Sequence, residues 1–366
     1  MEHKVQIPVD LLHHFEIPGA LVSVEELKRG HINHTYIGVW TLEGVTKRYV
    51  HQIVNHEVFR DVPGLMNNMR IVTNRICRRI TDGEARAGDT TLTIIPARSG
   101  ESFLVDEHGS YWRTFEFVER TVSFDVCPSV HAARESAAIL GRFQRYIDDV
   151  KVSELCDAIP FFHDGEKRYQ ALEKALSIDL YNKRSGAQKE VAFAITQRDL
   201  GGALVSALRS GRIPSRVAHH DMKLNNVLFD VDTLEARCLV DLDTCMPGTP
   251  LSDFGDLVRC TAVPCAEDET DLSKVAVDLE LYQAITEGYL AEFGEIITPA
   301  ERSLMSVAPR VLALILGVRF LTDHLSGDTY FRIHRPNHNL DRARTQFEVV
   351  RALARVEDEV GGWFEF

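Results

Sequence analysis

The chain has 366 residues, of which 45% are hydrophobic and 26% charged, a composition typical of a globular protein with room for two cores. Its formal net charge is −13, and no basic face is evident that could neutralise a phosphate backbone. The sequence therefore argues against a nucleic acid as partner.

Cysteine usage and hydropathy indicate the compartment. The seven cysteines are scattered without any C-x-x-C spacing, which predicts free thiols in a reducing cytosol and makes a zinc site improbable. The first residues contain no apolar signal-peptide region. The longest apolar run, residues 311–318, is too short to span a bilayer. We expect a cytoplasmic protein that does not contact a membrane.

The first third of the chain alternates apolar and polar residues and predicts a β-meander. Strands are expected over residues 35–40 and 47–54, with a turn at Glu43-Gly44 between them. Residues 63–80 carry apolar side chains at three- and four-residue spacing and predict a helix. Three further strands are expected over residues 91–96, 102–105 and 111–118.

From residue 121 onward the pattern becomes mainly helical. Amphipathic periodicity predicts seven helices, and no internal repeat or low-complexity linker interrupts them. They are expected over residues 129–150, 164–178, 190–208, 251–260, 272–293, 299–325 and about 339–359.

Between two short apolar segments lies a polar loop with the spacing H-x-D-x4-N, which begins at His219 and contains Asp221 and Asn226. The next apolar segment, residues 238–240, ends at Asp241. Phosphoryl transfer needs a carboxylate that orients and deprotonates the acceptor hydroxyl, and ligands for the metal that holds the phosphates. Mg²⁺ prefers oxygen ligands. We therefore predict Asp221 as the general base, with Asn226 and Asp241 as Mg²⁺ ligands.

Residues 219–226 resemble the catalytic loop H-R-D-L-K-x-x-N of the kinase-like phosphotransferases, the superfamily of protein kinases, aminoglycoside phosphotransferases and choline kinases. The resemblance implies ATP and Mg²⁺ as cofactors and an α+β, bilobal protein-kinase-like fold. An antiparallel-sheet N-lobe would cover residues 1–118, and a mainly helical C-lobe residues 119–366. By analogy with this loop, Lys223 either holds the transferring phosphate, which we favour, or forms a salt bridge nearby. The hinge that binds adenine would be Phe115, Glu116, Phe117 and Val118.

Two further aspartates need assignment. Asp243 is either a second metal ligand or a turn residue before Pro247-Gly248. Asp253 opens the sequence D-F-G, which spells the metal motif of protein kinases, but it lies in the first turns of a predicted helix. We therefore predict that Asp253 is structural and hydrogen-bonds the backbone of the catalytic loop.

The N-lobe departs from the protein-kinase pattern. The strand that should carry the phosphate-binding lysine has His51 and Gln52 there, and the helix that should supply its glutamate partner has Arg70. We expect no lysine–glutamate ion pair. Phosphate binding would then depend on the loop backbone, the metals and another cation, which puts protein-kinase activity in doubt.

Three stretches, residues 30–36, 241–248 and 319–331 followed by 337–340, look like the N-acetylhexosamine 1-kinases of the aminoglycoside phosphotransferase group. That resemblance implies phosphorylation of the anomeric hydroxyl of N-acetylglucosamine or N-acetylgalactosamine. A small-molecule sugar and ATP would be the partners, and no protein partner is evident. The sugar pocket would be lined by His31, Asn33, Asp221, Arg319 and Tyr330.

Simpler interpretations of these residues remain. His31 and Asn33 could only shape a turn. Arg319 could form a surface ion pair with Asp323, four residues along a helix, and Tyr330 could pack in a core. Phe161 and Phe162 are expected in the core.

Other functions also remain open. One is a kinase for choline, homoserine, an aminoglycoside or a fructosamine, and another is a nucleotide-binding pseudokinase. An amine acceptor calls for acids or an aromatic cage. Arg319 suits a neutral, amide-bearing sugar better.

Overall fold

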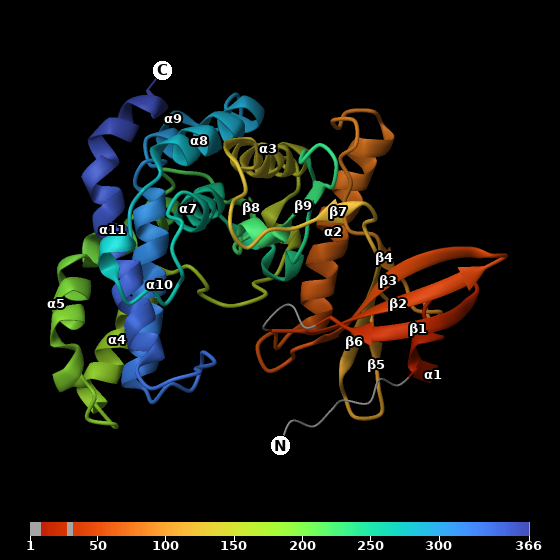
Figure 1. The fold of residues 1–366 in the computed structure, drawn as a ribbon, viewed down its shortest axis with the longest axis horizontal. Coiled ribbons are helices and arrows are strands. Elements are labelled where there is room, and N and C mark those ends of the chain that lie inside the picture. The colour runs from red at the N-terminus through yellow and green to blue at the C-terminus, as the bar shows by residue number, and fades with distance from the viewer. Residues whose placement is uncertain (1–8, 28–31, 366) are drawn as a thin grey trace.

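The computed structural model describes residues 9–27 and 32–365, and these form two lobes, a sheet with one long helix and a larger helical body (Figure 1). The bilobal α+β fold is confirmed. The last strand of the large sheet ends at Glu116. A division of the chain at residue 118 stays a prediction.

The N-lobe sheet has the strand order β1-β2-β3-β6-β4, with β5 also paired to β6, and all its pairs are antiparallel. The strands expected over residues 91–96 and 102–105 are only two residues long. The reason is that β4 and β5 share one edge of β6, which pairs with β4 at Thr114 and Phe115 and with β5 at Tyr111 and Trp112. The strands are β1 (Ala20–Glu26), β2 (His34–Leu42), β3 (Val45–Val54), β4 (Ile94–Ile95), β5 (Leu104–Val105) and β6 (Tyr111–Glu116).

Helix α2 (Val62–Thr81) lies between the sheet and the helical lobe (Figure 1). Its N-cap is Asp61, whose side chain accepts from the Gly64 amide. On its buried face, the Asn68 amide nitrogen donates to the carbonyls of Cys156 (2.8 Å) and Cys245 (3.0 Å). These bonds tie the predicted helix to the C-lobe beside the loop that carries the candidate metal residues.

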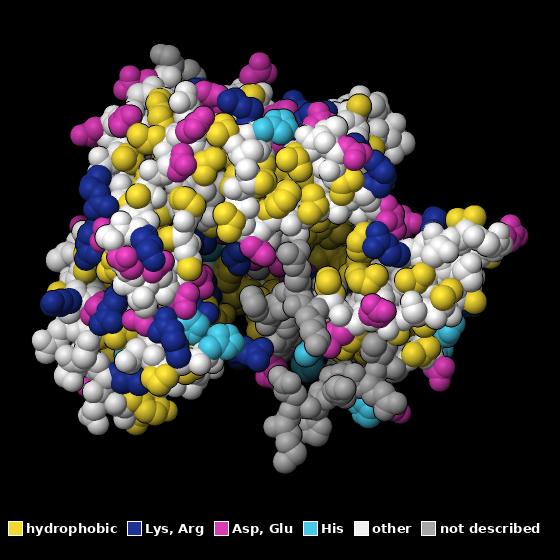
Figure 2. All heavy atoms as spheres, viewed as in Figure 1, with side chains coloured by type: hydrophobic (Ala, Val, Ile, Leu, Met, Phe, Trp, Pro, Cys, Tyr) yellow, Lys and Arg dark blue, Asp and Glu magenta, His cyan; other side chains and the backbone are white. Residues whose placement is uncertain are grey.

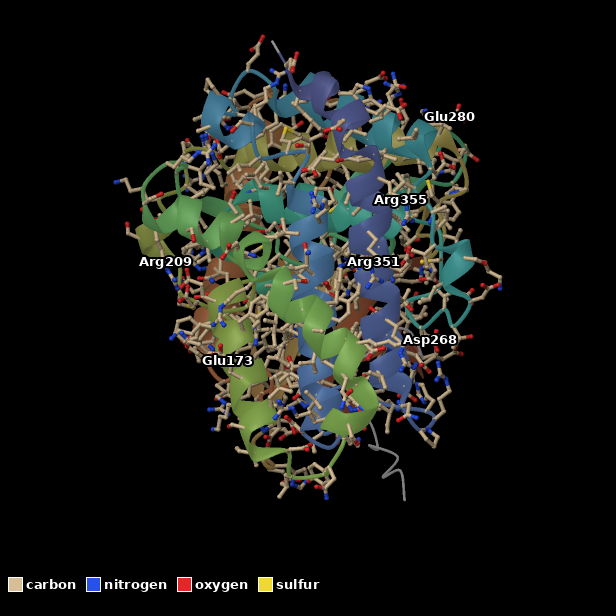
Figure 3. All side chains as sticks on the ribbon, turned by 90° about the vertical axis from the view of Figure 1, so that its left-hand side faces the viewer. Glu173, Arg209, Asp268, Glu280, Arg351 and Arg355 are labelled. Atoms are coloured by element: carbon tan, nitrogen blue, oxygen red, sulfur yellow. The ribbon has the colours of Figure 1, made fainter. Side chains whose placement is uncertain are left out.

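The C-lobe is built around two helix pairs, α3 on α8 and α10 on α11. The outer face of α11 carries Arg351 and Arg355, which both pair with Glu348 (Figure 3). The short α1 (Val9–Leu12) belongs to the other lobe. The C-lobe helices are α3 (Val130–Tyr146), α4 (Gly165–Ile178), α5 (Gln188–Thr196), α6 (Arg198–Arg209), α7 (Pro250–Thr261), α8 (Leu279–Phe293), α9 (Pro299–Arg302), α10 (Ala308–Leu325) and α11 (His338–Gly361).

Three of the predicted helices are divided, so their predicted extents were wrong. Residues 190–208 form α5 and α6, which meet at Gln197. Helix α8 begins only after Asp278, because that side chain caps it by accepting from the Leu281 amide at 3.0 Å. Residues 299–325 divide into α9 and α10, and Pro309 in the first turn of α10 cannot continue a helix from before it.

Two small sheets hold the catalytic loop at the base of the cleft. One has the order β10-β9-β7, and the other pairs β11 with β8. Pro247 and Gly248 pair with Val217 and Arg216, and Asp243 before them lies in a single 3-10 turn, Leu242–Thr244. A Cβ on Gly248 would lie 2.3 Å from Cε1 of His220, so only glycine fits there. The strands are β7 (Thr121–Val122), β8 (Arg216–Ala218), β9 (Val227–Asp230), β10 (Ala236–Leu239) and β11 (Met246–Gly248).

All seven cysteines are free thiols. None of the helices within the described ranges combines the length and the apolar character that a membrane crossing needs.

His51 lies on the face of β3 that points away from the cleft. Its side chain is fully buried beside the rings of Phe15 and Trp40, and its Nδ1 lies 2.8 Å from Oγ1 of Thr114. Burial lowers the pKa of His51 to about 4. Its neighbour Gln52 therefore faces the cleft, at the position where a lysine was expected.

This burial predicts acid sensitivity. The unfolded chain binds a proton at His51 near the ordinary histidine pKa, whereas the folded chain binds it only near pH 4. The stability that neutral His51 contributes is therefore lost as the pH falls from about 6.5 toward 4. At pH 5 the loss is about 2 kcal/mol. We expect the melting temperature to fall between pH 7 and pH 5, and to fall less in His51→Gln. An equal fall in both proteins would contradict the assignment.

Candidate active site

Asp253 holds the backbone of the catalytic loop. Its carboxylate is fully buried and accepts from the amides of His219 (2.8 Å) and His220 (2.7 Å), and Gln144 donates to it at 3.2 Å. Burial raises the pKa of Asp253 to about 6. His220 has a positive φ of 66°, a conformation that these bonds help to maintain. The predicted hydrogen bonds between Asp253 and the backbone of the loop are confirmed, and the assignment of Asp253 as structural stays a prediction.

His219 connects the catalytic loop to the strand that leads to Asp241. Its Nε2 lies 3.0 Å from the carbonyl of Val240, and its Nδ1 accepts from the Asp221 amide at 3.3 Å. Oγ1 of Thr244 donates to the His219 carbonyl at 2.6 Å. The two parts of the site predicted from sequence therefore share one buried histidine.

Asp221 forms a salt bridge with Lys223, with 2.7 Å between Nζ and Oδ1. Burial alone would raise the pKa of Asp221, but the charge and hydrogen bond of Lys223 outweigh it and hold that pKa below its usual range. Burial opposes the charged form of Lys223, and Asp221 more than compensates, so the pKa of Lys223 is raised. Asp221 is thus ionised at neutral pH, as a general base must be.

Asn226 and Asp241, the two predicted metal ligands, both interact with Asp221. Nδ2 of Asn226 donates to the Asp221 carbonyl at 2.7 Å, which leaves its Oδ1 as the oxygen that can face a cation. Asp241 lies two residues after β10, has a φ of 60° and is open to solvent. Surrounding protein atoms, and then the charges of Asp243 and Asp221, raise its pKa well above the usual range. A divalent cation would relieve that repulsion.

Asp243 is buried and held from the N-lobe. Arg113 of β6 binds it with a bidentate pair, Nη1 to Oδ1 at 2.5 Å and Nη2 to Oδ2 at 2.9 Å. Asn33 donates to Oδ2 at 2.7 Å. Arg113 also donates to Oε1 of Gln52 from Nε (3.0 Å) and Nη2 (2.8 Å). Our sequence reasoning missed Arg113, although it is the one cation within the strand that leads to the hinge.

Gln52 and Arg70, which stand where protein kinases have the paired lysine and glutamate, do not contact each other. Gln52 donates to Oγ1 of Thr35 at 3.0 Å. On α2, Arg70 is exposed and donates to Asn67. Met66 faces the cleft instead, with Sδ 3.8 Å from Nη1 of Arg113. In the described part of the chain, no lysine–glutamate pair connects β3 with α2.

These oxygens suit Mg²⁺. Within residues 9–27 and 32–365, no group of three or more His, Cys, Asp or Glu could by itself hold a metal ion. Mg²⁺ keeps several waters and is usually bound by one or two carboxylates together with substrate phosphates. The Asp241 carboxylate and the Asn226 amide oxygen match that smaller ligand set.

Arg319 of α10 is surrounded by aromatic rings. Its guanidinium carbon lies 5.1 Å from the ring centre of Phe162, 5.3 Å from Phe331 and 5.7 Å from Tyr330. Tyr330 is 60% exposed, so it is not packed in the core. Phe161 is 58% exposed and Phe162 is partly exposed, so the expectation that both lie in the core was wrong.

Asp323 shapes the loop that carries Tyr330. Its Oδ1 accepts from the amides of Thr329 and Tyr330 and its Oδ2 from that of Phe331, each at 2.9 Å. Asn339 donates to the same Oδ2. The alternative in which Asp323 forms a surface ion pair with Arg319 is therefore wrong.

His163 lies between the rings around Arg319 and the catalytic loop. Its Nε2 is 2.8 Å from the carbonyl of His220, and the two histidine rings are 5.3 Å apart. Burial lowers the pKa of His163 to about 4, and the charges of Arg319, Arg168 and Asp221 all act on it. The charges of Arg319 and Asp221 thus act on the same histidine, in opposite directions. Figure 2 shows a hollow between the two lobes.

The predicted hinge is extended. Glu116 donates its amide proton to the Thr93 carbonyl (3.0 Å), and Phe117 donates to that of Arg48 (3.1 Å). The N–H and C=O of one strand residue point the same way, so the Glu116 carbonyl points away from β3. Phe115 is buried, and Val118 accepts from Thr121. His31 lies outside the described residues.

A family model described as the phosphotransferase enzyme family matches residues 23–291. The chain is similar in structure to a microcompartment-associated aminopropanol kinase, with 16% identity, a TM-score of 0.63 and coverage of 96% of this chain and 97% of the other. It is also similar to an aminoglycoside phosphotransferase from Alicyclobacillus acidocaldarius (15%, 0.60, 97% and 96%) and a choline kinase from Cryptosporidium parvum (15%, 0.56, 93% and 91%). At these identities the structures establish the shared fold.

The two aspartates that compete for the metal role are separable by mutation. Asp253→Ala removes the acceptor of two buried amides and should lower the free energy of unfolding by about 3 kcal/mol. Asp241→Ala removes a repelled carboxylate, so it should leave the melting temperature unchanged or higher while Mg-ATP binding is lost. Thermal unfolding and calorimetric titration with Mg-ATP measure both. Loss of Mg-ATP binding only in a stably folded Asp253→Ala would reverse the assignment.

Proposed function

The chain belongs to the phosphotransferase enzyme family, and on that basis we propose that it is an ATP- and Mg²⁺-dependent kinase of N-acetylhexosamines. The acceptor would be the anomeric C1 hydroxyl of N-acetylglucosamine or N-acetylgalactosamine, and the product the sugar 1-phosphate. The nucleotide proposal is supported by the fold, which the chain shares with a spectinomycin phosphotransferase whose structure contains ADP.

The observation that carries the sugar proposal is the charge of the acceptor side. Arg319 lies among three aromatic rings. Burial, and then the charge of Arg319, lower the pKa of Arg168 to about 10. A second cation, such as the ammonium of choline or an aminoglycoside, would be repelled there. A neutral sugar could instead accept a hydrogen bond from Arg319 at its acetamide carbonyl and stack on a ring face.

In this mechanism Asp221 would orient the C1 hydroxyl and take its proton as the oxygen attacks the γ-phosphorus, while the bond from that phosphorus to the β,γ-bridging oxygen breaks and ADP leaves. Lys223 pairs with Asp221 and would keep it ionised before the sugar binds, and it would also contact the transferring phosphoryl group. Asn226, Asp241 and Asp243 would hold Mg²⁺, which when bound neutralises charge on the phosphates. Asn33 and Tyr330 would contact the sugar hydroxyls, with His31 from the same loop as Asn33.

Adenine would bind at the hinge formed by residues 115–118. The Glu116 carbonyl, which points away from β3, would accept from the exocyclic amine of adenine. Buried Phe115 would form the wall behind the ring. Such a hinge would bind the nucleotide through backbone groups. Its side chains would therefore have little influence on which molecule accepts the phosphoryl group.

A panel of acceptors tests the proposal. We expect Mg-ATP turnover with N-acetylglucosamine or N-acetylgalactosamine and phosphate at C1 of the product. Choline, ethanolamine, homoserine, a fructosamine and kanamycin should give no turnover above background. Asp221→Asn should reduce turnover by about 10³-fold while the nucleotide still binds, because the positioned base is lost.

Other outcomes of the panel discriminate between the alternatives. Turnover only with an amine would keep Asp221 as base and reject the sugar pocket. ATP binding without turnover of any acceptor would favour a pseudokinase.

The Asp221–Lys223 pair also predicts a pH effect. In Lys223→Met, burial is no longer opposed, so the pKa of Asp221 should rise. Since the base acts when deprotonated, the acid limb of kcat/KM should move to higher pH, by about 1 to 3 units. Lys274→Met removes a surface charge that pairs with Glu269 and should leave the limb in place. The same limb in Lys223→Met as in the unaltered protein would show that Asp221 is not the titrating base.

A further inference from the structure

The buried ion pair between Arg113 and Asp243 differs from the protein-kinase arrangement, in which a strand lysine pairs with a helix glutamate. Arg113 is 1% exposed and Asp243 is 2% exposed. Burying two charges is costly unless the geometry is good and the remaining donors and acceptors are satisfied. The pair joins the central strand β6 of the N-lobe to the loop between Asp241 and Cys245 of the C-lobe.

We propose that Arg113 is a positioning residue of the metal site, which holds Asp243 in the orientation that Mg²⁺ requires. The interaction between the lobes would then replace the pair between a strand lysine and a helix glutamate. This inference rests on the proposed function only in that the chain binds a metal–nucleotide complex. It does not depend on which acceptor is phosphorylated.

The donors of Arg113 indicate that it acts through Asp243 rather than on a phosphate. A guanidinium has five N–H groups. Nε and one Nη2 proton point to Oε1 of Gln52, and one proton each of Nη1 and Nη2 points to Asp243. The last Nη1 proton faces Sδ of Met66. All five groups are thus directed at these three side chains.

The acceptors of Asp243 show which oxygen remains for a metal. Each carboxylate oxygen has about two lone-pair sites. Oδ2 receives one hydrogen bond from Arg113 and one from Asn33, so both of its sites are used. Oδ1 receives one hydrogen bond, from Nη1 of Arg113. Asp243 would therefore bind Mg²⁺ through Oδ1 alone, and Arg113 fixes the direction of that oxygen.

The same contacts couple metal binding to the approach of the two lobes. Besides its bond to Asp243, Asn33 accepts from the Asn55 amide at 3.0 Å, so two segments of the N-lobe converge on this carboxylate. Helix α2 is fixed separately, through Asn68. Opening of the lobes would separate Asp243 from Arg113 and Asn33. No glutamate on α2 would need to move for this.

Manganese binding tests the proposal, because Mn²⁺ takes the same carboxylate and carbonyl oxygens as Mg²⁺ and is visible by electron paramagnetic resonance. Mn²⁺ is titrated into the full chain with a non-hydrolysable ATP analogue. Arg113→Gln should weaken Mn²⁺ binding by about 10- to 100-fold, the usual effect of losing a residue that orients a ligand. Arg113→Lys keeps the charge without the fork and should weaken it less. Should Arg113→Gln fail to fold, Arg113→Lys carries the test.

The matched control is Arg142→Gln. Arg142 is equally buried and pairs with Asp89 at 2.7 Å, but its partners are outside the proposed site. Both glutamine variants should lose melting temperature, and only Arg113→Gln should lose Mn²⁺ affinity. The double variant Arg113→Gln/Asp243→Asn should bind Mn²⁺ no more weakly than Asp243→Asn alone.

Two results would overturn the proposal. Unchanged Mn²⁺ affinity in a folded Arg113→Gln or Arg113→Lys would make the pair merely structural. An equal loss of analogue affinity with and without metal would make Arg113 a direct phosphate ligand. Neither readout uses an acceptor, so failure of the sugar assignment would leave this test intact.

Discussion

Three carboxylates in one cleft repel one another, and the site depends on how each of them is compensated. Asp221 has Lys223, and Asp243 has Arg113. Asp241 opens to solvent, and its pKa is raised by its surroundings and by the other two aspartates. Two protein cations thus satisfy two of the carboxylates. The third has the environment in which a divalent cation gives most relief.

Rigid placement of these charges depends on buried polar groups that do not take part in the chemistry. Asp253 fixes the catalytic loop by its backbone, and His219 joins that loop to the strand before Asp241. Such contacts satisfy backbone amides in a tight loop, where these amides have no partner in a helix or a β-sheet. Because Asp253 accepts these hydrogen bonds, the D-F-G sequence that it opens lies near the site, although our assignment gives it no metal ligand.

Local sequence was sufficient for much of this arrangement. The spacing of apolar residues predicted α2 to within one residue at each end, and the H-x-D-x4-N pattern located the catalytic loop. Arg113 could not be assigned in this way, because its role depends on the β3–β6 register that places it opposite Gln52 and on Asp243, 130 residues away. The exposure of Phe161 and the helix break at Gln197 likewise depend on tertiary packing.

In the proposed site, Asp221, Asp241 and Asp243 would form the metal side, and Arg319 and Arg168 the acceptor side. The ring centre of His163 lies 4.6 Å from that of Phe162, which contacts Arg319, and 5.3 Å from that of His220. Burial lowers the pKa of His163 to about 4 and that of His220 to about 3. Because both rings stay uncharged at neutral pH, they neither pair with Asp221 as cations nor add positive charge beside Arg319. Under the proposed function, an uncharged acceptor would present a hydroxyl to Asp221 and a carbonyl to Arg319, whereas the charge of an amine would be repelled by Arg319.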